Sequence, residues 1–318
     1  MQGVFLDRES LDRGDLDLQP LHDVLSQWQM YPATRPAETA SRIRNASVVV
    51  SNKVMLDREI LEAADDLQLV CIAATGTNNI DLETAQRRGL RVCNVTGYAT
   101  RSVVEYVFAQ LLSLYRRLPA YHAAVRAGKW QQSGHFCLLD YPIHELHGQT
   151  LGIIGYGELG HAVARAGEAF GMRVLVAERA NVAPREGRTP LGSVLAQSRV
   201  VSLHCPLTAQ TRNLIGGNEL AQMREDAVLV NTARGGIVDE AALLHALQTG
   251  RIAGAIVDVL EVEPPRRGNP LLAAGLPNLL VTPHIAWASI ASRQQLVNEI
   301  ADNIRAWLGG TARNVVST

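Results

Sequence analysis

The sequence is poor in several features that mark specialised classes of protein. Aromatic residues make up only 5% of its 318 residues, none of its four cysteines forms a C-x-x-C pair, and no apolar run approaches the length of a membrane span. The cysteine pattern argues against a disulfide framework and a structural zinc site. The missing apolar run argues against a membrane protein. We therefore expect no metal and no membrane partner.

No region carries a marked excess of charge of one sign. The 30 basic and 31 acidic residues give a net charge of −1, without a run of like charges, so we expect no nucleic-acid partner. The N-terminus has no basic segment followed by an apolar one, which predicts a cytoplasmic protein. Small molecules are the expected partners.

The abundant residues describe a globular α/β protein of two domains. Apolar residues make up 47% of the chain, and its length exceeds that of one typical domain. Short β-branched runs alternate with helical periodicity in the first third, which predicts a parallel sheet. These runs are Val4–Asp7, Ser47–Ser51, Leu69–Ala74 and Arg91–Asn94.

A second series of such runs predicts a second doubly wound sheet. Its members are Thr150–Ile154, Arg173–Ala177, Val200–His204, Ala227–Asn231, Gly254–Asp258 and Leu279–Thr282. A helix over Ser102–Leu118, ending before Pro119, should link the domains, and a helix over Ala291–Leu308 should return to the first one. The predicted domains are 1–97 with 286–318, for the substrate, and 98–285, for a dinucleotide.

A glycine-rich turn follows the first strand of the second series. Gly155-Tyr156-Gly157-Glu158-Leu159-Gly160 is a G-x-G-x-x-G motif that opens a helical stretch. The glycines permit a tight turn and close approach of a pyrophosphate to the helix N-terminus. A plain glycine turn is the alternative, but the strand before it and the helix after it favour dinucleotide binding.

The end of the next predicted strand bears on the choice of cofactor. Glu178 lies 23 residues after Gly155, close to the offset of about 20 residues for the acid that binds the ribose hydroxyls of NAD. NAD is therefore favoured. Arg179 keeps NADP open, because a guanidinium there could accept a 2′-phosphate, although a solvated surface charge is the alternative.

Three residue types suited to reducing a 2-oxo acid follow strands of the second series. Arg234 offers a planar, permanent cation, His284 an acid/base, and Glu263 a carboxylate that would fix the tautomer of His284 and favour its imidazolium form. Alternatively, Arg234 could be a surface charge, Glu263 a solvated loop acid and His284 a structural histidine. His204 is the rival acid/base, although we favour it as a wall of the cofactor site.

The first predicted sheet offers a further candidate loop. The strand Leu69–Ala74 runs into Thr75-Gly76-Thr77-Asn78-Asn79. A glycine-containing turn after a buried strand exposes backbone N–H groups that can bind a carboxylate. A simple Asn-rich turn is equally compatible with the local sequence.

With these residues in view, the chain resembles the D-isomer-specific 2-hydroxyacid dehydrogenase family over essentially its whole length. The resemblance implies two Rossmann-like domains, a flavodoxin-like substrate domain and a dinucleotide-binding domain. The matching motifs are Ala74–Asp81, Gly155–Gly160, Ser202–Thr208, Asn231–Asp239, Asp258–Pro264 and Thr282–His284.

The resemblance also implies roles for particular residues. Arg234, Glu263 and His284 would be the catalytic trio, and Thr75, Gly76 and Thr77 would bind the substrate together with Arg234 and His284. Asp258 would hold the nicotinamide carboxamide. The remaining implied cofactor contacts are Gly155, Tyr156, Gly157, Glu158, Leu159, Gly160, Glu178, Arg179, His204, Cys205, Pro206, Thr211, Thr232, Ala233, Arg234 and His284. A homodimer through the cofactor domains is implied as well.

Further segments are most similar to the glycerate dehydrogenase, or hydroxypyruvate reductase, subgroup: Asn94–Tyr98, Trp130–Ser133 and Ile285–Ser289. We therefore expect reduction of hydroxypyruvate, and of glyoxylate as a secondary substrate. Many relatives have Asp where this chain has Glu178-Arg179, so use of both NAD and NADP stays open. Because the sequence stops at Thr318, we expect no regulatory domain of the kind that some phosphoglycerate dehydrogenases carry, which makes phosphoglycerate a less favoured substrate without excluding it.

Two alternatives to this function remain. Another 2-oxo acid reductase, for D-lactate or phosphoglycerate, would use the same residues. A non-catalytic NAD-sensing protein would keep the fold, but an intact set of Arg234, Glu263 and His284 favours catalysis.

Overall fold

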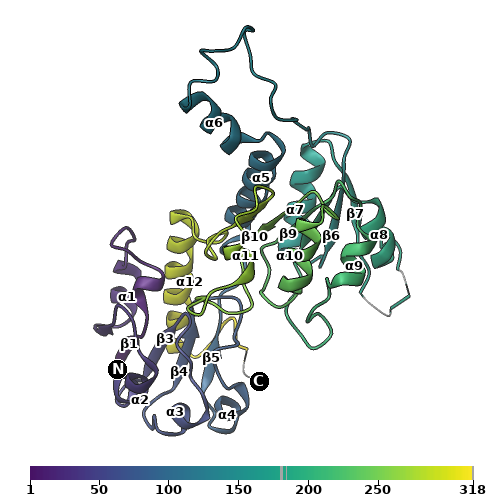
Figure 1. Ribbon diagram of the computed structural model, residues 1–318. Coiled ribbons are helices and arrows are strands. Elements are labelled where there is room, and N and C mark those ends of the chain that lie inside the picture. The colour runs from purple at the N-terminus through teal and green to yellow at the C-terminus, as the bar shows by residue number, and fades with distance from the viewer. Residues whose placement is uncertain (180–181, 184, 317–318) are drawn as a thin grey trace. The chain divides into compact units, whose positions relative to one another are not determined.

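The computed structural model describes residues 1–179, 182–183 and 185–316. The chain forms two compact units, one of residues 1–99 with 287–318 and the other of residues 100–286. Each unit is an α/β layer structure around its own parallel sheet (Figure 1). The fold class predicted from the sequence is therefore confirmed.

The first unit contains a five-stranded parallel sheet in the order β2-β1-β3-β4-β5. Its strands are β1 (Gln2–Phe5), β2 (Gln27–Met30), β3 (Val48–Ser51), β4 (Leu69–Ile72) and β5 (Arg91–Cys93). Strands β3 and β4 are buried throughout, as expected where helices cover both faces of a parallel sheet. The helices are α1 (Gln19–Val24), α2 (Pro36–Ile43), α3 (Arg58–Glu62), α4 (Leu82–Arg87) and α12 (Ile290–Leu308), with a 3-10 turn at Arg8–Ser10.

The second unit contains a six-stranded parallel sheet in the order β11-β10-β9-β8-β6-β7. Its strands are β6 (Thr150–Ile154), β7 (Arg173–Val176), β8 (Val200–Leu203), β9 (Val228–Asn231), β10 (Gly254–Val257) and β11 (Leu279–Val281). Its helices are α5 (Thr100–Tyr115), α6 (Leu118–Arg126), α7 (Glu158–Ala169), α8 (Leu191–Gln197), α9 (Gly217–Gln222), α10 (Glu240–Gln248) and α11 (Pro270–Ala273). The strand order reverses beside β6, which places a ligand crevice at the carboxyl ends of the strands.

The C-terminal helix completes the core of the first unit, as predicted. Five buried residues of α12, from Leu296 to Ile304, join Phe5, Val48 and Cys71 in one apolar cluster. The helix begins at a side-chain cap, in which Ser289 accepts a hydrogen bond from the backbone N–H of Ser292. Residues 287–316 are therefore folded with the first 99 residues.

Two elements differ from the sequence prediction. The linking helix ends at Tyr115 rather than Leu118, and Pro119 lies in the first turn of a second helix, α6. Arg117 separates them with a left-handed backbone, at φ 52°, and proline is well tolerated in a first helical turn. Strand β2 was not predicted, because QWQM has no β-branched residue and lies at the edge of its sheet.

None of the described helices combines the length and the apolar character needed to cross a membrane.

Candidate functional site

The polar residues predicted for the site follow strands of the second sheet at its carboxyl edge. Gly155 follows β6, Glu178 comes two residues after β7, and His204 follows β8. Arg234 lies in the loop after β9, Glu263 in the loop after β10, and His284 three residues after β11. All six strands are parallel, so one edge of a single unit carries the whole set.

The glycine-rich turn has the shape that a dinucleotide requires. Gly155 has a left-handed φ of 92°, and a Cβ there would lie 2.5 Å from the backbone nitrogen of Cys205. A Cβ on Gly160 would lie 2.1 Å from the carbonyl oxygen of Gly155. A Cβ on Gly157, by contrast, would meet nothing within 4 Å, and Gly157 is the N-cap residue of α7, which therefore starts without a side-chain cap. A pyrophosphate can therefore approach the uncapped first turn of α7.

A second feature of this edge also fits a bound cofactor. The hydroxyl oxygen of Thr232, after β9, is buried and has no hydrogen-bond partner among the described residues. Buried polar atoms in native proteins normally have such a partner. The glycine turn and this hydroxyl together show that the residues present fit a nicotinamide dinucleotide.

The side chains of the glycine-rich turn contact neighbours within the unit. The ring of Tyr156 packs on His161 with centroids 3.6 Å apart, and the Arg188 guanidinium carbon lies 4.6 Å from the Tyr156 ring centroid. Glu158 is hydrogen-bonded to Thr100. Arg188 therefore lies beside the turn, although it is 32 residues after Tyr156 in the sequence.

Glu178 is held by a partner that the sequence analysis did not identify. Its Oε1 accepts hydrogen bonds from the Arg179 backbone N–H and from Arg185 Nη2, both at 2.8 Å. Its Oε2 accepts from Arg185 Nε at 2.8 Å and from the Arg185 backbone N–H at 3.2 Å. The Arg185 guanidinium is the main reason that the pKa of Glu178 falls to about 2. This acid is therefore bonded at both oxygens within the protein itself.

His204 and its neighbours form an inert wall. Its Nε2 lies 2.9 Å from Ser202 Oγ, and its Nδ1 is buried without a partner among the described residues. Burial lowers the pKa of His204 to about 4, so the ring is neutral at pH 7, which argues against it as a proton donor. Thr211 closes the following loop by donating to the Pro206 carbonyl at 2.6 Å, and burial raises the pKa of Cys205.

The loop that carries Arg234 is fixed by its own backbone. Asn231, at the end of β9, accepts from the Ala233 N–H and donates to the Arg234 carbonyl. A Cβ on Gly235 would lie 1.9 Å from the Leu260 carbonyl oxygen. This close approach, which only glycine permits, brings the loop of Arg234 against the loop that leads to Glu263.

The structure brings Glu263 and His284 into direct contact. His284 Nδ1 lies 2.7 Å from Glu263 Oε2, and the side chains are 27% and 33% exposed. Glu263 Oε1 accepts from the Leu260 backbone N–H at 2.8 Å, which fixes the carboxylate. A carboxylate on one ring nitrogen selects the tautomer and orientation of the ring, which is the arrangement expected of a general acid/base.

Asp258 has partners that reduce its capacity for a ligand. It is 1% exposed and accepts from Thr282 Oγ1 and from the backbone N–H groups of Ile285 and Ala286. Burial raises its pKa, and these donors oppose the shift. Its predicted contact with a carboxamide stays a prediction.

The candidate substrate loop belongs to the first unit. Thr75 donates its hydroxyl to the Val95 carbonyl at 2.8 Å, and Asn94 donates to the Thr75 carbonyl at 2.8 Å. Gly76 and Thr77 are partly exposed. The loop is thus fixed within its unit, and its role in substrate binding stays a prediction.

Comparison with known proteins assigns the chain to a family. Residues 108–286 match the model described as D-isomer specific 2-hydroxyacid dehydrogenase, NAD binding domain. The chain belongs to the D-isomer specific 2-hydroxyacid dehydrogenase family. It is therefore an oxidoreductase, and its second unit is a nicotinamide-dinucleotide-binding domain.

Similar proteins cover nearly the whole chain. Glycerate dehydrogenase of Methylorubrum extorquens is 45% identical over 98% of both chains, and hydroxypyruvate reductase of Blautia hydrogenotrophica is 36% identical over 100% of both. A solved NADPH-dependent glyoxylate/hydroxypyruvate reductase of Sinorhizobium meliloti has a TM-score of 0.82 and 29% identity, covering 99% of this chain and 96% of that one.

Within residues 1–179, 182–183 and 185–316, no cluster of three or more His, Cys, Asp or Glu side chains is arranged to hold a metal ion.

Proposed function

We propose that this chain reduces hydroxypyruvate to D-glycerate, and glyoxylate to glycolate, with hydride from a nicotinamide cofactor. One observation carries the proposal: the 2.7 Å contact between His284 Nδ1 and Glu263 Oε2, at the sheet edge where the glycine-rich turn fits a dinucleotide. The relatives named glycerate dehydrogenase and hydroxypyruvate reductase support the choice of substrate.

The role of His284 follows from its contact with Glu263. Since Nδ1 is the atom that bonds Glu263, Nε2 is the atom that exchanges a proton with the substrate oxygen. The carboxylate of Glu263 stabilises the imidazolium that must donate this proton in the direction of reduction. A nicotinamide held at the glycine-rich turn would, when bound, supply hydride for reduction of the 2-oxo group.

Arg234 supplies the positive charge that the substrate needs. Its guanidinium would bind the substrate carboxylate and polarise the 2-oxo group, for which a planar cation with several donors is suited. In the first unit, the backbone of Thr75, Gly76 and Thr77 would bind the same carboxylate. Residues 1–97 with 286–318 would then act as the substrate domain, and residues 98–285 as the cofactor domain.

A spectrophotometric assay tests the proposed function. NADH and NADPH oxidation would be followed with hydroxypyruvate, glyoxylate, pyruvate and 2-oxoglutarate, and the reverse reaction with D- and L-glycerate. We expect the highest kcat/KM for hydroxypyruvate, lower values for the others, and oxidation of D-glycerate only. A preference for pyruvate would favour the D-lactate alternative. Silence with every substrate would favour a non-catalytic dinucleotide-binding protein.

We further propose that the chain accepts NADPH as well as NADH. The oxygens of Glu178 are bonded by Arg185 and by the backbone, so the acid is less available to ribose hydroxyls than a lone carboxylate. Arg179, Arg185 and Arg188 lie at this end of the edge, where a 2′-phosphate would find guanidinium donors. The related reductase from Sinorhizobium meliloti, described as NADPH-dependent, agrees with this proposal.

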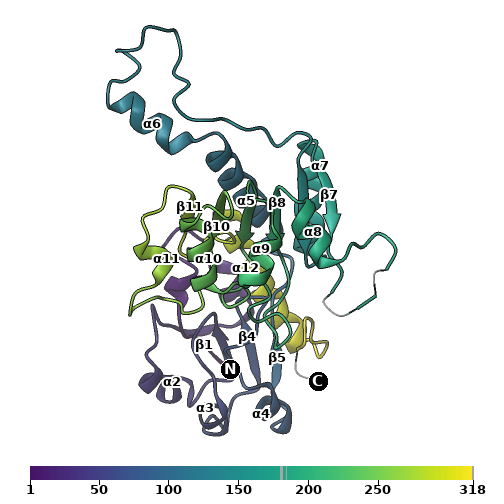
Figure 2. The ribbon, with the colours of Figure 1, turned by 45° about the vertical axis from the view of Figure 1, so that its right-hand side comes forward.

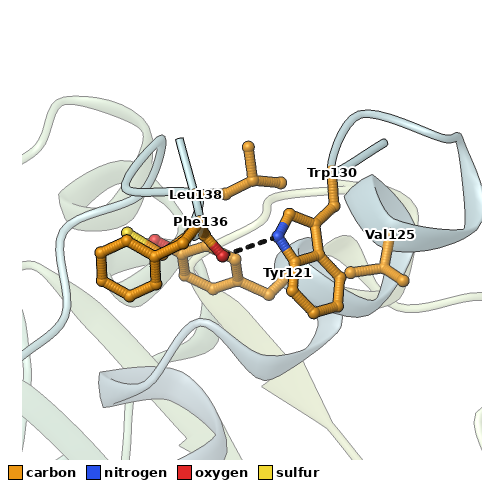
Figure 3. Close-up of a pocket in the computed structure, with 6 residues that line it drawn as sticks. Tyr121, Val125, Trp130, Phe136 and Leu138 are labelled. Atoms are coloured by element: carbon orange, nitrogen blue, oxygen red, sulfur yellow. Dashed lines mark hydrogen bonds between the residues drawn. The ribbon is translucent and has the colours of Figure 1, made fainter. Parts of the chain in front are cut away.

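A homodimer through the second unit is also part of the proposal. Helix α6 and the chain after it extend from the sheet of their unit (Figures 1 and 2) and expose apolar side chains, with Phe136 92% and Leu139 80% accessible. Figure 3 shows the apolar pocket there, in which Trp130 donates its indole N–H to the Phe136 carbonyl at 3.0 Å. Such exposed apolar surface is typical of a subunit interface. Light scattering should give a dimer mass, and Phe136→Asp with Leu139→Asp should give a monomer.

We propose the cytoplasm as the place of action. Cys71 and Cys93 lie opposite each other on β4 and β5, yet both are free thiols. A reducing compartment maintains thiols in this state. Fractionation of the producing cell, with the activity as marker, tests the location.

A further inference from the structure

The turn that carries His284 has an unusual backbone. His284 has a left-handed φ of 56°, a conformation that residues with a Cβ rarely adopt unless the surrounding structure holds it. Its backbone N–H donates to the carbonyls of Asp258 and Thr282, at 2.8 and 3.0 Å. The direction of the His284 side chain therefore depends on contacts that keep this turn in place.

The carboxylate of Asp258 holds the turn from inside. Its Oδ1 accepts from Thr282 Oγ1 at 2.6 Å and from the Ile285 N–H at 2.9 Å, and its Oδ2 accepts from the Ala286 N–H at 2.8 Å. These donors lie on both sides of His284 in the chain. Asp258 thus ties together the two flanks of the strained residue.

Two side chains of helix α5 bond the same two flanks. Tyr106 is hydrogen-bonded to Thr282 Oγ1, and Ser102 donates to the Ala286 carbonyl at 2.7 Å. The Thr282 hydroxyl has a single proton, which goes to Asp258, so Tyr106 must be the donor in its bond to Thr282. Ser102 and Tyr106 are four residues apart and so lie on one face of the helix.

We propose that Ser102 and Tyr106, which we call the α5 clamp, are positioning residues for proton transfer, because they hold the turn that presents His284. The clamp touches no reacting atom and acts through Thr282, Asp258 and Ala286. Its kinetic effect rests on the proton-transfer role proposed for His284. Both clamp residues and the whole turn up to Ala286 belong to the second unit, so the clamp fixes the turn of His284 to helix α5 of the unit that also carries Glu263.

Substitution of one hydroxyl tests the α5 clamp against a matched control. Tyr106→Phe removes the donor to Thr282 and keeps the ring. Tyr115→Phe removes a buried hydroxyl from the same helix at a position facing Arg199, whose guanidinium lies 5.8 Å from the Tyr115 ring. Ser102→Ala is a milder second variant, which keeps the test decisive should Tyr106→Phe fold poorly.

Two measurements are made on each variant. Amide hydrogen exchange of residues 282–287, read by mass spectrometry without cofactor, should be about tenfold faster in Tyr106→Phe than in wild type, and unchanged in Tyr115→Phe. With hydroxypyruvate, kcat should fall about tenfold, with a larger primary deuterium isotope effect and an unchanged dissociation constant for NADH. A lower fraction of folded enzyme would reduce kcat without changing the isotope effect.

Each outcome bears on the α5 clamp. Wild-type exchange in both clamp variants, or equal effects of Tyr106→Phe and Tyr115→Phe, would overturn it. Faster exchange with an unchanged kcat would overturn the positioning role. If the wild-type chain reduces no 2-oxo acid, the proposed function fails, while the exchange data still decide whether the clamp holds the turn.

Discussion

The two halves of the carboxyl edge of the second sheet contain the same residue types in different pairings. In the half formed by β6, β7 and β8, Glu178 is bonded to Arg185 and His204 to Ser202. In the half formed by β9, β10 and β11, Glu263 and His284 are bonded to each other. A carboxylate and an imidazole therefore bond to each other only where the loops bring them together, which is why we propose the acid/base pair in the second half and only a binding surface in the first.

The largest expected effect distinguishes His284 from His245, an exposed histidine of the same unit. His284→Ala should lower kcat for hydroxypyruvate by about 10³-fold, because it removes the proposed proton donor. The dissociation constant of NADH, measured by fluorescence, should change less than about twofold. His245→Ala, at an exposed position on α10 of the same unit, is the control and should keep the wild-type rate. Equal loss of turnover and of NADH binding would contradict the role given to His284.

The next effect concerns Glu263, the acid in the half formed by β9, β10 and β11. Glu263→Gln should lower kcat about 10²-fold, since a neutral amide no longer stabilises the imidazolium of His284. Glu261→Gln is the matched control, because Glu261 is exposed and pairs with Arg212 on the surface. Steady-state kinetics of both variants check this. A Glu263→Gln enzyme as fast as its control would remove Glu263 from the mechanism.

Glu178, the acid in the half formed by β6, β7 and β8, should affect the choice between NADPH and NADH and not the rate of the chemical step. Arg185→Ala removes the guanidinium donors to Glu178, leaves its two backbone hydrogen bonds and removes a cation, so the ratio of NADPH to NADH affinity should fall about tenfold. Titration of cofactor fluorescence gives both dissociation constants. Comparing the affinities of 2′,5′-ADP and ADP isolates the contribution of the adenosine end of the cofactor. Arg224→Ala, whose guanidinium pairs with Asp226, is the control. An unchanged ratio would mean that Arg185 has no part in selectivity.

The smallest effect is on acid stability. Burial lowers the pKa of His204 to about 4, while the unfolded chain binds the proton near pH 6.5. Between pH 6.5 and pH 4 the unfolded state therefore binds more protons than the folded state. The contribution of neutral His204 to the free energy of unfolding is complete above pH 6.5 and is lost as the pH falls towards 4. His204→Gln should reduce the slope of unfolding free energy against pH by up to about 1.4 kcal/mol per pH unit. Urea denaturation at several pH values measures the slope, and an equal slope in both proteins would contradict the assignment.

Much of the fold was predictable because strands and motifs are local signals. Short β-branched runs marked ten of the eleven strands found among the described residues, and the glycine motif placed the turn between β6 and α7. The sequence predicted that Glu263 and His284 lie close together, since the loops after adjacent parallel strands meet at one edge of a sheet. Strand β2 was missed because its residues alternate between exposed and half-buried positions without a β-branched signal.

Other features could not be predicted from the sequence because they depend on side-chain geometry. Arg185 follows Glu178 by seven residues in a loop with no periodicity, so no pattern indicated its bond. Ser102 and Tyr106 resemble any other polar residues of a helix, and only the structure shows that they reach Thr282 and Ala286. The left-handed backbone of His284 is likewise a product of these tertiary contacts.

Chemical rescue tests most directly whether the imidazole of His284 delivers the proton. In the His284→Ala enzyme, a single turnover of bound NADH with hydroxypyruvate would be followed by stopped flow at increasing concentrations of imidazole. The rate should be low without imidazole and should rise with the concentration of its protonated form, because free imidazolium replaces the missing donor. A rate near that of wild type without imidazole, and insensitive to its addition, would contradict the account.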